Sequence, residues 1–276
     1  MYTTRKSRIF FLFIVLLTGT LIVAGCKPIS SLPTGPVNTS QSSQTVYLWI
    51  SADKDTYVSK DEKERNFGQS SNLSVAGSQI ALKRSYVHFT LPTLPVSTKI
   101  EEAYLELYHS GKNEDGKTDD IMMPVAKCPF QWNPLTLTYE KEPTPISTSE
   151  GSFRIKLRSQ DWSGSENINV LMGDYFANPQ DFFGFIIQWH YQSLGIEKGF
   201  YSNNHISRTV SDLGLAPRLL VKLTLPDGKT VNDITLPSVL PADNDLNFNS
   251  GATVLMINSV TGGNNWPASW DVAATK

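Results

Sequence analysis

Short apolar runs, most of them with a period of two residues, recur along the middle of the chain. Residues 153–157 alternate apolar and basic side chains, and residues 85–90 place Val87 and Phe89 on one face. This period is typical of strands that bury one face. Residues 182–189 are apolar nearly throughout, which favours a strand buried on both faces. Further strands are predicted at residues 46–50, 72–77, 100–108, 121–130, 199–202 and 218–225.

One segment departs from this pattern. In residues 167–178, the side chains of Ile168, Met172 and Tyr175 recur with helical spacing, and Pro179 follows the run. This predicts a short helix. About ten short strands, without the strand–helix alternation of a parallel sheet, predict an all-β fold. We expect an antiparallel jelly-roll β-sandwich with one short helix.

The N-terminus has the pattern of a targeting segment. A basic stretch from Arg5 to Arg8 precedes the apolar residues 9–23, a run that is short for a membrane span. The run ends in small residues followed by Cys26, which resembles the lipobox of bacterial lipoproteins. We therefore expect a signal peptide over residues 1–25 and a secreted protein, at the extracellular face or in the periplasm, anchored to the membrane through lipidated Cys26. The alternative is an ordinary secretory signal in which Cys26 has no role.

Composition divides the remainder of the chain into three parts. Residues 26–45 are rich in Ser, Thr and Pro and predict a flexible tether. Residues 46–225 carry the strand pattern and predict the folded domain. Residues 226–276 are rich in Asn, Asp, Gly and Pro, and predict a partly disordered extension to which the apolar run 252–257 adds a strand.

Charge and cysteine content exclude some classes of function. The chain has a formal net charge of −2, and removal of residues 1–25 takes away basic residues and no acidic one. A general nucleic-acid binder is therefore not expected. With Cys26 acylated, Cys128 is the one remaining cysteine, so an internal disulfide or a Cys-based zinc site is not expected either. Cys128 fits a small buried apolar residue.

A series of weak motifs, in a fixed order, resembles a known family. The order is Asp-x-Tyr-Val, then Asn-Phe-Gly, then Arg-Ser-Tyr, then a strand of alternating Ala and Leu, and finally Trp and Thr-aromatic before a Pro. Together these motifs resemble the DNRLRE domain, also classed as carbohydrate-binding module family 96, over residues 46–224. The resemblance implies a jelly-roll that binds acidic polysaccharide of the alginate type. The residues that carry it are Asp55, Tyr57, Val58, Asn66, Phe67, Gly68, Arg84, Ser85, Tyr86, Ala103, Leu105, Leu107, Trp132, Thr138, Tyr139 and Pro143.

Cations near these motifs are candidates for binding the carboxylates of such a glycan. Guanidinium and ammonium groups give charge-assisted hydrogen bonds to carboxylate, and Arg can give two at once. Two alternatives stay open. Neighbouring acidic residues could cancel the charge of the first three candidates, and Arg84 could be a structural arginine that ties the Asn66–Gly68 turn to the sheet. The candidate residues are Lys60, Lys63, Arg65, Lys83 and Arg84.

Aromatic residues supply a second set of candidates. Trp132 and Tyr139 could form a platform for the apolar face of a sugar ring, or could pack in the core. Trp266 and Trp270 are a weaker case of the same kind. A further basic stripe on one strand is expected to face solvent, and its residues are Arg154, Lys156 and Arg158.

A structural Ca²⁺ is the one cofactor that the sequence suggests. Carboxylate oxygens are the ligands that Ca²⁺ prefers, and Asp53 with Asp55 are candidates, because they stand close together in an acidic turn. The alternative set is Asp115, Asp119 and Asp120. Neither set has the spacing of an EF-hand loop.

Catalysis has little support in the sequence, because nucleophile elbows, zinc-protease motifs and phosphate loops are missing. His205, Tyr201 and Arg208 could be arranged as in a polysaccharide lyase. The function predicted is a non-catalytic, carbohydrate-binding module that binds acidic polysaccharide as a monomer. The alternatives are a structural or adhesive surface protein without glycan affinity and, third, a lyase.

Overall fold

β-strands dominate the computed structural model, which describes residues 43–78, 82–113, 121–143, 153–158, 161–189, 193–204, 215–237 and 254–257. The chain divides into two compact units, Met1–Thr39 and Ser40–Lys276, and all described residues lie in the second. The predicted mostly-β fold with one short α-helix is confirmed. The helix α1 (Asn169–Ala177) lies within the predicted residues 167–178. The strands are β1 (Thr45–Ser51), β2 (Lys54–Ser59), β3 (Asn72–Ser78), β4 (Leu82–His88), β5 (Lys99–Asn113), β6 (Met122–Lys127), β7 (Phe153–Lys156), β8 (Trp162–Ser165), β9 (Phe185–Ile187), β10 (Ser193–Tyr201), β11 (Arg218–Thr224) and β12 (Val254–Ile257).

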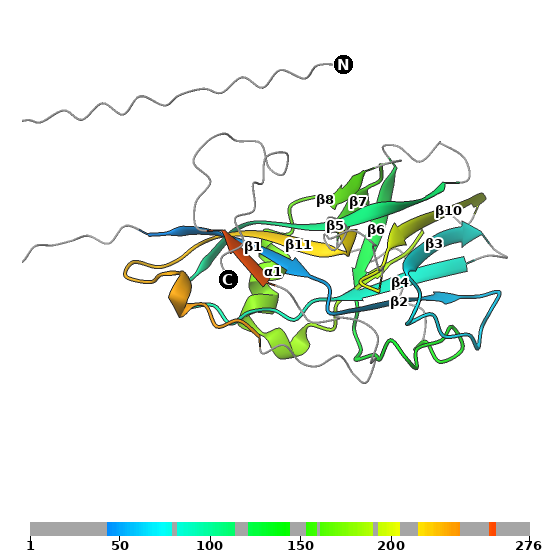
Figure 1. Ribbon diagram of the computed structural model, residues 1–276, viewed down its shortest axis with the longest axis horizontal. Coiled ribbons are helices and arrows are strands. Elements are labelled where there is room, and N and C mark those ends of the chain that lie inside the picture. The colour runs from blue at the N-terminus through cyan, green and yellow to red at the C-terminus, as the bar shows by residue number, and fades with distance from the viewer. Residues whose placement is uncertain are drawn as a thin grey trace, which may run out of the picture. The chain divides into compact units, whose positions relative to one another are not determined.

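Hydrogen bonding joins these strands into one sheet that closes on itself (Figure 1). The order β10-β3-β4-β9-β6-β7-β8-β5 returns to its start, because β10 also pairs with β5. Strand β5 makes closure possible since it is long. Along one edge it pairs first with β11 and then with β10, and along the other edge it pairs with β8. The described strands therefore form a barrel-like closed sheet, and the two separate sheets of the expected jelly-roll sandwich are not distinguished. The polar residues after position 108 predict that this strand ends there, whereas it continues through them to Asn113.

Three strands, β11, β1 and β12, extend from β5 beyond the closed ring. β12 lies in the apolar run 252–257 and pairs with β1, so this run adds a strand, as predicted. The folded domain was predicted to end at residue 225, but the short 3-10 helix η4 (Val231–Asp233) lies after that residue. Ile234, next to it, is buried in the main core, and Thr235 bridges to Thr93. Residues after 225 thus contribute to the same core.

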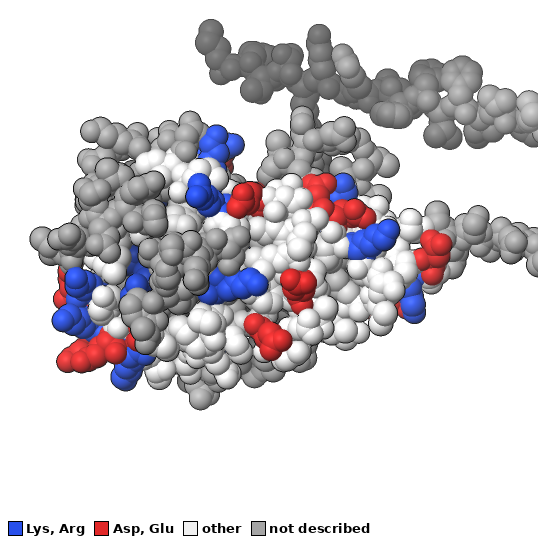
Figure 2. All heavy atoms as spheres, turned by 180° about the vertical axis from the view of Figure 1, so that it is seen from behind, with Lys and Arg blue, Asp and Glu red and all other residues white. Residues whose placement is uncertain are grey.

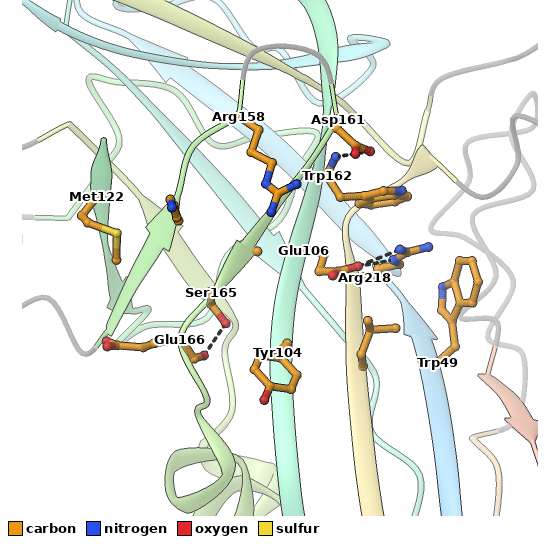
Figure 3. Close-up of a pocket in the computed structure, with 13 residues that line it drawn as sticks. Trp49, Tyr104, Glu106, Met122, Arg158, Asp161, Trp162, Ser165, Glu166 and Arg218 are labelled. Atoms are coloured by element: carbon orange, nitrogen blue, oxygen red, sulfur yellow. Dashed lines mark hydrogen bonds and ion pairs between the residues drawn. The ribbon is translucent and has the colours of Figure 1, made fainter. Parts of the chain in front are cut away.

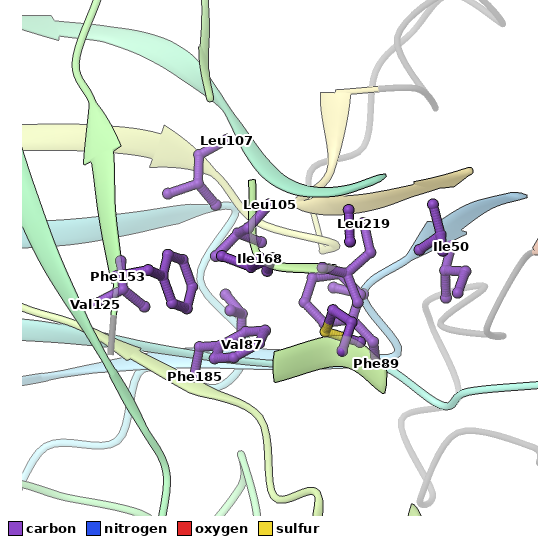
Figure 4. Close-up of a cluster of buried hydrophobic side chains, with 14 of the residues drawn as sticks. Ile50, Val87, Phe89, Leu105, Leu107, Val125, Phe153, Ile168, Phe185 and Leu219 are labelled. Carbon is purple, nitrogen blue, oxygen red and sulfur yellow. The ribbon is translucent and has the colours of Figure 1, made fainter. Parts of the chain in front are cut away.

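Alternating residues of the strands fill the interior of the barrel (Figure 4). Leu105 and Leu107 of β5 point inward with Val87 of β4 and Phe185 of β9, and all four are fully buried. The helix closes this core from one side with Met172 and its neighbours. For β4, β5 and β7, the alternation that predicted the strand therefore also grouped the residues that face the core.

The outer surface of the barrel has two contrasting regions. Over β2, β4, β9 and β6, a second apolar cluster lies outside the sheet, where residues 128–143 pack against Tyr86 and Ile186. We call this region the covered face. The outer surface of β1, β11, β5, β8 and β7 carries no such segment among the described residues, and we call it the open face. In the described part of the chain, no helix has the length and apolar character that crossing a membrane requires.

Candidate functional site

The sequence-predicted cation Arg84 lies within the covered face. It is 6% exposed and forms an ion pair with Glu142, and the hydroxyl of Tyr86 donates to the same carboxylate. Burial, together with the Glu142 charge, raises the pKa of Tyr86 above its usual range. The guanidinium also lies 5.5 Å from the ring centroid of Tyr139. Arg84 therefore has a structural partner, but this partner is Glu142 rather than the Asn66–Gly68 turn.

The two predicted platform residues pack against the same face. Trp132 is 6% exposed, and its indole N–H donates to the carbonyl of Phe183 at 2.9 Å. Its ring meets Tyr86 edge-on, with 5.6 Å between centroids. Tyr139 packs against the second cluster below Arg84. Both aromatic faces thus contact protein, which is the packing alternative that the sequence left open.

Two other predicted cations are matched by carboxylates. Arg65 is exposed, pairs with Glu62 at 2.5 Å, and lies 4.9 Å from the ring centroid of Phe67. Lys83 pairs with Glu197 at 2.8 Å. Basic and acidic side chains are likewise intermixed over the described surface seen in Figure 2. The sequence alternative in which neighbouring carboxylates cancel these positive charges is thus seen for Arg65, and Lys83 is paired as well.

The last two predicted cations, Lys60 and Lys63, lie at the start of an exposed turn and within it. Lys60 follows β2, and its backbone N–H donates to the carbonyl of Leu82 at 2.9 Å. Lys63 is exposed in the turn, and its carbonyl accepts from the N–H of Glu140 at 3.1 Å. Lys60, Lys63, Arg65, Lys83 and Arg84 therefore do not converge on one pocket.

The candidate calcium ligands Asp53 and Asp55 already bond to protein groups. The ring Nδ1 of His88 lies 2.7 Å from Asp53, and the hydroxyl of Thr90 donates to it at 2.9 Å. Although burial opposes ionisation, these groups hold the pKa of Asp53 below its usual value. Asp55 accepts from the Ser202 hydroxyl at 2.6 Å.

Asp55 also accepts from the N–H of Asn203 at 2.8 Å, and burial raises its pKa to about 7. Within the described ranges, no group of three His, Cys, Asp or Glu side chains could hold a metal ion. Several other candidates lie outside the described residues, and these are Cys26, Asp115, Asp119, Asp120, His205, Arg208, Trp266 and Trp270. Cys128 is buried as expected, and burial raises its pKa to about 11.

A pocket of about 1020 Å³ lies on the open face. Three aromatic side chains line it, Trp49 from β1, Tyr104 from β5 and Trp162 from β8, and each is partly exposed. All three occupy outward positions of strands whose alternate residues are buried in the main core. The pocket therefore exists because the outer surface of these strands has no covering segment among the described residues.

One row of paired residues crosses the sheet at this pocket. Ser51 pairs with Arg218, and Arg218 pairs with Glu106. Glu106 pairs in turn with Gly164, and Gly164 with Lys156. At Gly164 the row has no side chain. A Cβ there would meet nothing nearer than Glu106 Oε1, at 3.8 Å, so this glycine leaves space that a larger residue would fill.

Arg218 organises one side of the pocket (Figure 3). Its guanidinium lies 3.4 Å from the ring centroid of Trp162 and 4.3 Å from that of Trp49. Its Nε donates to Glu106 Oε2 at 2.8 Å, and a second nitrogen lies 2.7 Å from the same oxygen. Burial lowers the pKa of Arg218, while the Glu106 charge opposes this effect. A cation held between two indoles fixes both rings in place.

Carboxylates of the pocket are engaged by protein donors. Glu106 pairs with Arg218, Asp161 accepts from the N–H of Trp162 at 2.8 Å, and Glu166 accepts from a backbone N–H at 3.0 Å. Arg158 is exposed, and Figure 3 shows it across the pocket from Trp49. Within the described part of the chain, the Arg158 guanidinium has no hydrogen-bond or ion-pair partner.

The sequence pattern does not identify the aromatic residues of this pocket as binding residues, but it does identify its basic stripe. Of that stripe, Lys156 and Arg158 line the pocket and Arg154 does not, and all three are exposed, as expected. The signal for Trp49 and Trp162 was present as large aromatic residues at the outward positions of strands. Bringing them together required the register of four strands, which spacing along the chain does not contain.

Comparison with known proteins gives a match that covers residues 46–165. No curated protein sequence matches this chain at a significant level. The family profile described as carbohydrate-binding module family 96 matches residues 46–165. These residues run from β1 to β8, so they include Trp49, Tyr104 and Trp162, but not Arg218. Over residues 46–165 the chain is thus similar to carbohydrate-binding module family 96, which supports the presence of a carbohydrate-binding module.

Proposed function

We propose that this protein is a non-catalytic module that binds acidic polysaccharide of the alginate type in the pocket of the open face. The observation that carries the proposal is the convergence of Trp49, Tyr104, Trp162 and Arg158 on one pocket, largely within the residues that match the family. The sequence-predicted residues of the covered face are, in this proposal, mainly structural.

The chemistry of the pocket suits a sugar acid. A pyranose ring has an apolar face, which packs against partly exposed indole rings. Each uronate residue also carries a carboxylate, for which a guanidinium supplies two directed hydrogen bonds. Glu106 is paired with Arg218, whereas Arg158 has no ion-pair partner among the described residues, so its guanidinium is available to the carboxylate of a sugar acid. This favours an anionic sugar over a neutral one.

Secretion and lipid attachment through Cys26 belong to the same proposal, on the sequence pattern alone. A jelly-roll arrangement of the strands and a structural Ca²⁺ also stay predictions. A module tethered through residues 26–45 would hold acidic glycan at the membrane surface.

Affinity electrophoresis tests the proposed function. The purified protein should be retarded in a native gel that contains alginate, and less so in one that contains a neutral glucan. Arg158→Ala should weaken binding roughly tenfold, the loss expected for one charge-assisted contact. Arg154→Ala is the matched control, because it removes the same charge from an exposed arginine of β7 that does not line the pocket. Equal migration of the unmodified protein with and without alginate would contradict the proposal.

A further inference from the structure

A second pocket, of about 480 Å³, lies beside the segment that covers β2 and β4. We call it the loop pocket. Lys54 and Lys141 line it together with the aromatic residues Phe130 and Trp132. None of the described residues that line it is an Asp or Glu, in contrast to the open-face pocket with its three carboxylates. A pocket with two cations and no acidic group attracts anions.

The cation at one wall has a fixed position. The Lys54 ammonium donates to the carbonyl of Trp132 at 3.2 Å and lies 5.0 Å from the centroid of its ring. Trp132 is itself anchored by its hydrogen bond to Phe183. This positive charge is therefore held at the wall before any ligand arrives, which lowers the entropy cost of binding.

The second cation, Lys141, is not paired with Glu142, the acidic residue that follows it in sequence. Glu142, which follows it, turns inward to the ion pair with Arg84 and the hydroxyl of Tyr86. Lys141 is exposed, and within the described ranges its ammonium has no hydrogen-bond or ion-pair partner. The buried ion pair therefore separates the two neighbouring charges, and leaves the positive one at the pocket.

The backbone around the pocket is held in one conformation. The side-chain amide of Asn66 donates to the carbonyls of Pro134 at 2.7 Å and Leu137 at 2.8 Å. Gly68 allows this close approach, since a Cβ there would lie 2.1 Å from the Pro134 oxygen. Asn133, which also lines the pocket, accepts from the N–H of Leu135 at 2.8 Å.

We propose that the loop pocket is a second binding site for the carboxylate of a uronate residue, separate from the open face. Its ammonium groups match the negative charge, and the partly exposed ring of Phe130 and the neutral polar side chains match the remainder of a sugar ring. This inference rests on the proposed function, because it takes the same class of ligand. With both pockets occupied, one molecule holds two segments of acidic glycan, and the apparent affinity for a polymer exceeds that of either site.

Lys141→Glu tests this site in the whole protein, with alginate in a native gel as the probe. The variant should bind roughly tenfold more weakly than the unmodified protein, because an attraction becomes a repulsion. Lys99→Glu makes the same charge change at an exposed lysine that lines neither pocket, and should bind as before. Both variants should keep the melting temperature of the unmodified protein, since both side chains are exposed.

These measurements distinguish failure of the loop pocket from failure of the proposed function. If the unmodified protein is retarded and Lys141→Glu migrates like Lys99→Glu, the loop pocket is not a binding site and the proposed function stands. If the unmodified protein is not retarded at all, the proposed function fails, and this inference fails with it. A Lys141→Glu, Arg158→Ala double variant should lose more affinity than either single variant, and equality with Arg158→Ala would also overturn the second site.

Discussion

The covered face and the open face are two outer surfaces of the same sheet, and each carries a tryptophan beside a buried Arg–Glu pair. On the covered face, the side chains of Arg84 and Glu142 are each 7% exposed, and Glu142 belongs to the segment of residues 128–143 that packs on the sheet. On the open face, the side chains of Arg218 and Glu106 are 9% and 8% exposed. Similar groups thus have different surroundings, because residues 128–143 pack on one surface, whereas no described segment packs on the other.

The difference lies in what the aromatic rings contact. Trp132 contacts Tyr86 and bonds to Phe183, so its faces contribute to stability. Trp49 and Trp162 contact Arg218 and keep part of their surface at the pocket. A tryptophan near an arginine is therefore not by itself evidence for a binding platform. What distinguishes the two cases is how much of the tryptophan ring stays exposed.

The largest effect is expected at the covered face. Trp132→Ala should lower the free energy of unfolding by about 3–5 kcal/mol, the range for removal of a large buried aromatic residue. Urea denaturation followed by circular dichroism measures this loss. Arg65→Ala, at an exposed ion pair, should change stability by less than about 1 kcal/mol. A stable Trp132→Ala protein that binds alginate poorly would instead give Trp132 the role of a ligand contact.

A pH effect of a few kcal/mol or less should follow from Asp55, which ties β2 to residues 202–203. Its pKa is about 7 in the folded protein, above the unfolded value of 3.8, so the folded state binds its proton more tightly. The free energy of unfolding should therefore fall as pH rises from about 4 to 7, and then level off.

Asp55→Asn keeps the shape of the protonated side chain, and should remove that slope and stabilise the protein at pH 8. Denaturant midpoints at pH 5 and pH 8 check both statements. This range avoids Asp53, whose lowered pKa supplies stability that is lost as pH falls below about 4. Persistence of the same slope in Asp55→Asn would show that another group titrates.

The smallest effect on stability, with the clearest effect on binding, should come from the open face. Trp162→Ala should weaken alginate binding by roughly ten- to a hundredfold, equivalent to about 1–3 kcal/mol of lost contact. Gly164→Leu should act in the same direction by filling the pocket from its floor, without a backbone clash. Gly173→Leu, on the helix where a Cβ meets nothing within 4 Å, is the control. Unchanged binding in both pocket variants would place the glycan elsewhere.

Local patterns predicted most of the fold. Alternation identified the inward residues of β4, β5 and β7, and helical spacing identified α1, because burial of one face imposes its period on the sequence. Closure of the sheet could not be predicted, because it depends on β10 pairing with the last residues of β5, which are polar and gave no strand signal.

The candidate site was predicted less well, for a related reason. Trp49 and Trp162 are distant in sequence, and they meet Arg218 through the registers of β1, β11, β5 and β8. Trp132 and Arg84 had equally suitable chemistry, but both are buried where residues 128–143 pack against the sheet. Residue types can be read from a sequence, whereas exposure depends on contacts between segments that are far apart.

The position of β1 has a mechanical consequence. Beginning at Thr45, it is hydrogen-bonded on one edge to β11 over its seven residues and on the other edge to β12 over four. A pull on its N-terminal end, along the strand, loads the bonds of both edges in shear, so that they must break together rather than one after another. The strand that would receive tension from the N-terminal side is thus held between two others, so under the proposed function a load on a bound glycan would not unravel the module from that end.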